Sequence, residues 1–162
     1  MSRWKNKSPR PDHERSLEEL DGERWGAPLF DSYVVTTCHS MRKKPLVTLT
    51  DEELRLVIGQ GFSLEWLVPV ALERLKQDPL RAGDFHDGDL LANVLAIPAA
   101  WWETRAAETQ ALKAALSRAL DDERLIDRSA EWSPDHRDPP DERLIRLGHQ
   151  VRSVAARLGV TG

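Results

Sequence analysis

The loop over residues 83–89, GDFHDGD, holds the side chains most able to do chemistry. Its carboxylates and imidazole belong to Asp84, His86, Asp87 and Asp89. A calcium-binding EF-hand loop needs oxygen ligands at positions 1, 3 and 5, glycine at 6 and glutamate at 12. Counted from Asp84, position 5 is Gly88 and position 12 is Leu95, so the pattern is not met. Helix capping and an exposed acidic loop that meets a partner explain the same residues, and we expect no metal.

Cys38 and His39 are a second candidate pair, as a nucleophile beside its base. Neighbouring residues of a helix point about 100° apart, so these side chains would not face each other. Cys38 is the only cysteine, which excludes an internal disulfide and a cysteine-based zinc site. The sequence also has no phosphate-binding loop, nucleophile elbow or paired metal-binding histidines. We therefore expect neither an enzyme nor a bound cofactor.

The loop follows two helices that the residues 49–78 predict. Thr50 can cap the first helix, with Glu53 three residues later to complete a capping box. Gly59 and Gly61 are expected to stop it. Ser63 can cap the second helix, which Pro69 should kink or confine to its later part, and which Asp78-Pro79 should end. Its apolar stripe is formed by Leu64, Leu67, Val68, Ala71, Leu72 and Leu75.

A third helix is predicted directly after the loop, with Asp87 or Asp89 as its cap. Its apolar residues are Leu90, Leu91, Val94 and Leu95. Three short helices joined by tight turns are typical of the core of a small all-α domain.

The segment before residue 49 predicts two more short helices. Ser16 and Glu19 form a second capping box, for a helix that Gly22 closes. Trp25 is expected to pack on the domain. Residues 33–43 have the β-branched composition of a strand, but their apolar spacing and the basic residues at their end favour a helix.

Residues 96–162 predict a helix that begins at Pro98, a longer helix near 106–125 and a last amphipathic helix over 141–158. A polar, proline-rich connector separates the last two, over residues 129–140. The last helix could fold back on the core or form a dimer contact.

Together these patterns predict an all-α fold, a compact single-domain bundle of about six to seven short helices. We expect residues 1–15 to be a disordered basic tail, residues 16–125 to form the helical domain, and residues 126–162 to form the connector and the C-terminal helix. The chain has 162 residues and no apolar run near the ~18 residues of a membrane span. No secretory signal follows the basic N-terminus, so we expect a cytoplasmic protein.

The excess negative charge lies in the middle of the chain. Residues 51–95 contain 4 basic and 9 acidic residues, a net charge of −5, whereas the whole chain has −4. Such a segment repels nucleic acid and attracts a basic partner. A nuclease, which binds a phosphate backbone, is one such partner.

Several segments resemble the immunity proteins of bacterial contact-dependent growth inhibition (CDI) systems. They are DSYVVTTCHSMRKKPL (31–46), LTDEELRLVIGQ (49–60), LVPVALERL (67–75) and GDFHDGDLLANVL (83–95), followed by Trp101-Trp102. The loop departs from the family's usual aromatic and proline, which this chain replaces by His86 and Asp87. The resemblance implies that the chain neutralises the C-terminal toxin domain of a CDI effector.

The leading hypothesis is therefore a binding module that covers the toxin's active site or substrate surface. Its contact residues would be Asp84, His86, Asp87 and Asp89. A small hydrolase or transferase is the second hypothesis, and carboxylates with a raised pKa in a closed pocket would favour it. A helical regulator that binds nucleic acid is the third, and the acidity of residues 51–95 counts against it.

Overall fold

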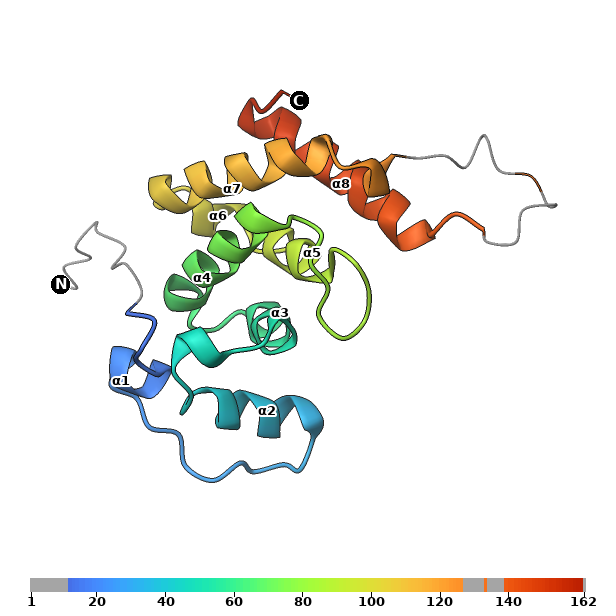
Figure 1. Cartoon of the computed structure of the whole chain (residues 1–162). Helices are drawn as coiled ribbons and strands as arrows, with labels where there is room; N and C mark the ends of the chain where they lie inside the picture. The colour runs from blue at the N-terminus through green and yellow to red at the C-terminus, as the bar shows by residue number, and fades with distance from the viewer. Residues whose placement is uncertain (1–11, 127–132, 134–138, 162) are drawn as a thin grey trace.

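The structure is a computed structural model that describes residues 12–126, 133 and 139–161. Within these residues it contains eight α-helices, two short 3-10 helices and no strand, which confirms the all-α prediction (Figure 1). The elements are α1 (Leu17–Asp21), α2 (Tyr33–Met41), η1 (Leu46–Thr48), α3 (Asp51–Gln60), α4 (Leu64–Gln77), α5 (Asp89–Leu95), α6 (Ala99–Trp102), α7 (Ala106–Leu120), η2 (Glu123–Leu125) and α8 (Glu142–Leu158).

Local capping explains where α1, α2 and α3 begin. Both predicted capping boxes are present, at Ser16 with Glu19 and at Thr50 with Glu53. Ser32 caps α2, so residues 33–41 are helical despite their β-branched composition. Helical packing of α2 on α3 thus overrides the strand propensity of that segment.

The end of α3 corrects the prediction for Gly59. The helix continues through this residue and ends at Gly61, which has a φ of 78°. Gly59 is instead a contact position, because a Cβ added there would lie 2.7 Å from Oδ1 of Asn93 on α5. Its lack of a side chain lets α3 and α5 pack closely.

Helix α4 is the centre of the core, and all six residues of its predicted apolar stripe are buried. Ser63 does precede it, but with a left-handed φ of 51° and no side-chain hydrogen bond to the helix. Its hydroxyl accepts a hydrogen bond from Arg42 instead. Pro69 lies inside α4, which runs on both sides of it, and the helix ends before Asp78 as predicted.

The start of α5 also differs from the prediction. Neither Asp87 nor Asp89 caps this helix: Gly88 is its N-cap, with a φ of 78°, and Asp89 is its first residue. A Cβ at Gly88 would lie 2.3 Å from Cδ2 of Leu147 on α8, so the close approach of α8 requires glycine there as well.

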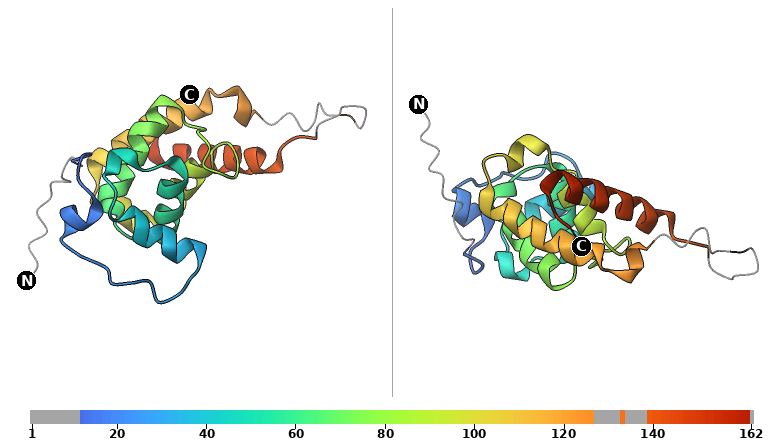
Figure 2. Two further views of the ribbon diagram at one scale, coloured as in Figure 1. Left: turned by 60° about the horizontal axis from the view of Figure 1, so that its bottom comes forward. Right: turned by 90° about the horizontal axis from the view of Figure 1, so that it is seen from above.

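Helix α8 folds back on the core. Leu147, Val151 and Ala155 are buried in the same apolar cluster as α4 and α7. The helix packs on α7, α5 and η2, and Figure 2 shows it lying across the end of the bundle. The C-terminal helix is thus part of the core that the earlier helices form.

Residues 12–15, which the sequence analysis assigned to the tail, bond to the domain. The backbone N–H groups of Leu46 and Val47 donate to the carbonyls of Arg15 and His13. The rest of the expected tail and most of the connector lie outside the described residues. No helix among the described residues is long and apolar enough to cross a membrane.

Candidate binding surface

The loop over residues 83–89 is anchored by a buried carboxylate. Asp89 is 3% exposed, and its Oδ1 accepts a hydrogen bond from the backbone N–H of Gly83 at 2.6 Å. Its Oδ2 lies 3.7 Å from Nε of Arg55 on α3. The contact therefore closes the loop on itself and ties it to α3. Asp89 positions the loop, and its carboxylate does not face solvent as a partner contact would.

Glu52 and Arg55 complete this anchor, and we call Glu52, Arg55 and Asp89 the buried network. Arg55 donates two hydrogen bonds to Glu52, both of 2.6 Å. Glu52 also accepts from the backbone N–H of Asp84 at 3.2 Å. These donors hold the pKa of Glu52 below its ordinary value, with the Arg55 hydrogen bonds as the largest cause. The guanidinium carbon of Arg55 lies 4.6 Å from the centre of the Phe85 ring.

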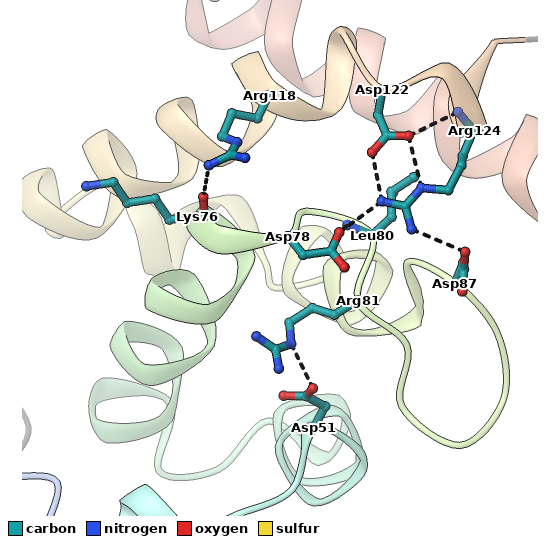
Figure 3. Close-up of polar contacts among 9 residues, drawn as sticks. All are labelled: Asp51, Lys76, Asp78, Leu80, Arg81, Asp87, Arg118, Asp122 and Arg124. Carbon is teal, nitrogen blue, oxygen red and sulfur yellow. Dashed lines mark hydrogen bonds and ion pairs between the residues drawn. The ribbon is translucent and has the colours of Figure 1, made fainter.

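A second group of charges meets the other side of the loop, and we call it the exposed network (Figure 3). Its members are Asp78, Asp87, Asp122 and Arg124. The guanidinium nitrogens of Arg124 lie 2.9 Å from Oδ1 of Asp78, 2.8 Å from Oδ2 of Asp122 and 3.3 Å from Oδ2 of Asp87. Hydrogen bonds from Arg124 hold the pKa of Asp122 below its ordinary value. This network joins the end of α4 and the loop to the segment after α7.

Between its two anchored ends the loop presents the side chains of residues 84–87. Asp84 and Phe85 are exposed, Phe85 by 67% of its surface, while His86 is half-buried. Asp87 is exposed although it pairs with Arg124. A ring nitrogen of His86 lies 3.1 Å from the carbonyl oxygen of Asp87, which fixes the imidazole over the loop.

Exposed apolar side chains that the sequence did not predict lie at the start of α2 and just before it in the chain. Leu29 is 89% exposed, Phe30 71% and Tyr33 64%. Tyr33 and Asp84 line the same cavity of about 430 Å³, with the N-terminal turn of α3 at its base. Figure 1 shows the chain leading into α2 below the loop. We call Tyr33 and Asp84–Asp87, together with Leu29 and Phe30 that precede Tyr33 in the chain, the loop face.

The acidity of residues 51–95 is mostly neutralised within the molecule. Seven of the nine acidic residues have a basic partner: six of them pair with lysine or arginine, among them Asp51 with Arg74 and Arg81, and Glu73 contacts the imidazole of His13. Within the described residues only Asp84 and Glu65 of this segment have no ion pair. Asp84 is therefore the one unneutralised carboxylate of the loop face from this segment.

The geometry offers little to the enzyme hypothesis. Among the described residues no group of three or more histidine, cysteine, aspartate or glutamate side chains could hold a metal ion. Cys38 is buried, and this burial raises the pKa of its thiol. His39 packs its ring against Trp25, at 5.0 Å between ring centres. The two buried carboxylates that lie together, those of Glu52 and Asp89, share an arginine, and the pKa of Glu52 is lowered where a general acid would need it raised.

Residues 19–112 match the sequence model of a family described as CDI immunity proteins. The chain belongs to this family. The match confirms the resemblance and extends from α1 into α7, so it includes the loop face and both α3 and α4. CDI immunity proteins are not a family of enzymes. The searches of curated proteins and of solved structures gave no significant match.

The matched range ends within α7, before η2 and α8. The buried network therefore lies wholly inside the family region, whereas the exposed network draws Asp122 and Arg124 from beyond it. Helix α8 lies wholly outside the matched region.

Proposed function

We propose that this CDI immunity protein binds the C-terminal toxin domain of its cognate effector in the cytoplasm and covers the toxin's active site or substrate surface. Membership of the family supports the immunity role. A steric mechanism needs no catalytic group on the immunity protein. The toxin we propose is a nuclease, whose phosphate-binding surface is basic and would be attracted by a negatively charged inhibitor.

The loop face is the surface we propose for this contact. Interfaces are enriched in aromatic anchors at their centre, and isolated monomers rarely expose several large apolar side chains together. Phe30, Tyr33 and Phe85 supply such anchors, and Asp84 supplies a carboxylate with no internal ion pair. The combination suits a partner with basic and apolar side chains side by side. It is the observation that supports this location most directly.

The four loop residues would then play different parts. Asp84 and Asp87 would pair with cations of the toxin, and Asp87 would exchange part of its contact with Arg124 for them. His86 would be a specificity position, because it lies in the centre of the exposed part of the loop. Asp89 would act by holding the loop in its bound conformation, which lowers the ordering cost of binding.

The first test is co-expression and pull-down with the effector C-terminal domain encoded next to this gene. The wild-type protein should form a complex and restore growth of cells that express the toxin. Asp84→Arg and Phe85→Ala should each weaken binding, because one reverses the free charge and the other removes an anchor. Losses of roughly tenfold or more are expected for such central contacts.

Glu65→Arg is the matched control for charge. It reverses the other unpaired carboxylate of the central segment, on α4 and outside the loop face, and should leave binding near wild type. Equal losses for Asp84→Arg and Glu65→Arg would show that net charge matters and the location does not. A folded wild-type protein that leaves an active toxin unbound would contradict the pairing itself.

A further inference from the structure

The largest cavity that we describe lies far along the chain from the loop face, between α6, α7 and α8. Its volume is about 710 Å³, which is within the range of small-molecule sites. Figure 1 shows α8 running back along α7, with α6 beside them. Because α8 lies outside the matched region, this cavity depends on a part of the chain that the family match does not include.

Apolar side chains form most of the cavity's wall. Its deeper part is lined by Ile97 and Leu112, which are buried, and its sides by Trp102, Val154 and Leu158, which are half-buried. The polar side chains Thr109 and Gln110 also reach it. A nucleotide or a sugar needs many convergent polar groups, whereas this wall suits an apolar body.

Two cations complete the lining, Lys113 on α7 and Arg157 on α8. Neither forms an ion pair with any described residue, while many other cations of the chain are paired. Glu103 also lines the cavity, at the end of α6. The cations therefore exceed the carboxylates by one at this site, in a protein whose net charge is −4.

We infer that this cavity binds a free amphipathic carboxylate, such as a medium-chain fatty acid. The aliphatic chain would lie on Ile97, Leu112 and the Trp102 ring, and the carboxylate would pair with Lys113 and Arg157. Arginine and carboxylate form paired, charge-assisted hydrogen bonds, which favours this head group over a neutral alcohol. The inference is independent of the toxin-binding proposal, because it uses none of the loop-face residues.

Titration of the full-length protein with dodecanoate, followed by calorimetry below the micelle concentration, tests the inference. We expect saturable binding at one site, and much weaker binding of dodecanol and of dodecyltrimethylammonium. Arg157→Gln should weaken dodecanoate binding by roughly tenfold, the usual scale for a lost hydrogen bond to a charged group. Arg146→Gln removes the same charge from an exposed position of α8 and should bind as wild type does.

Ala106→Trp provides a second variant that does not change charge. Ala106 is exposed on the cavity wall, so a large side chain there would fill the site without entering the core. It should abolish binding while the circular dichroism and the unfolding midpoint stay near wild type. The inference would be overturned if Arg157→Gln and Arg146→Gln lost the same affinity for dodecanoate, or if dodecanol bound as tightly as dodecanoate. It would also be overturned if the protein bound only to phosphatidylglycerol vesicles. Sedimentation showing a dimer that Ala106→Trp dissociates would overturn it as well, because a second copy would then fill the cavity.

Discussion

The buried network and the exposed network hold the same loop from two sides, yet they differ in solvent exposure. In the buried network the exposed fractions of the side chains are 19% for Arg55, 6% for Glu52 and 4% for Asp89. In the exposed network Arg124 is 40%, Asp78 45% and Asp87 48% exposed, and Asp122 alone is shielded, at 17%. Water screens most charges of the exposed network more strongly than those of the buried network, so an ion pair should contribute less to stability in the exposed network.

The difference in exposure also separates two roles of the loop, which must keep its conformation and must offer side chains to a partner. Backbone groups at Gly83 and Asp84 bond to the buried network, which fixes the start of the loop to α3. The exposed network reaches only a side chain of the loop, that of Asp87. A partner could replace the Arg124 contact without unfolding the loop, but it could not replace the contacts of Asp89.

The largest effect should come from Arg55→Met, which leaves two carboxylates buried without their cation. Breaking a buried ion pair by removing one partner costs about 3–5 kcal/mol, and we expect a loss of unfolding free energy in that range. Urea unfolding at pH 7 measures it. A loss below about 1 kcal/mol would mean that Glu52 and Asp89 are hydrated in solution, and the contrast with the exposed network would disappear.

The glycine between the two networks allows the next test. Gly88→Ala places a side chain at a φ of 78° and against Leu147, so we expect a loss of about 2–4 kcal/mol from left-handed strain and overpacking together. Gly61→Ala is the matched control, because it has the same φ but nothing within 4 Å of its Cβ. It should lose only the strain, about 1–2 kcal/mol. Equal losses in the two variants would mean that α8 does not press on the loop as the structure describes.

The sequence predicted those features that depend on near neighbours. The capping boxes at Ser16 and Thr50 need only residues three positions apart, and the stripe of α4 needs only helical periodicity. The helix after the loop was also predicted, but its cap was assigned to an aspartate. The carboxylate of Asp89 accepts a hydrogen bond from Gly83 and pairs with Arg55, so it does not cap the helix. The contact with Arg55 forms only when α3 and α5 pack together.

The candidate site was predicted less well for the same reason. The charge count correctly identified residues 51–95 as acidic, but it could not show that Asp51 would pair with Arg74 and Arg81. Exposure of Phe30 and Tyr33 depends on which elements leave that side of α2 uncovered. An aromatic residue beside a helix start is more often buried, so the pattern alone gave no signal. Which of the loop residues contact a toxin stays a prediction.

The dependence of stability on pH should sharpen the comparison. The pKa of Glu52 lies below its ordinary 4.5 in the folded chain, so its contribution is fully present above pH 4.5 and is lost as the pH falls through its folded pKa. Unfolding by urea from pH 7 to pH 3 should show this loss in the wild type and a smaller loss in Glu52→Gln. In Asp122→Asn the pH dependence of the unfolding free energy should differ from wild type only below about pH 3.8, the ordinary pKa of an aspartate. An identical pH dependence for Glu52→Gln and the wild type would contradict the role of Arg55.

The smallest effect should come from Arg124→Met, which removes the cation of the exposed network. Exposed ion pairs contribute about 0–1 kcal/mol, and we expect a loss of unfolding free energy below about 1 kcal/mol at low salt. At 1 M salt, where charges are screened beyond about 3 Å, the variant and the wild type should nearly coincide. The loss of unfolding free energy in Arg55→Met should persist in the same buffer, because solvent ions do not reach the buried carboxylates of Glu52 and Asp89. A deficit of Arg124→Met that also persists would show that Arg124 stabilises the loop by packing its stem on neighbouring side chains, and the two networks would then differ in position alone.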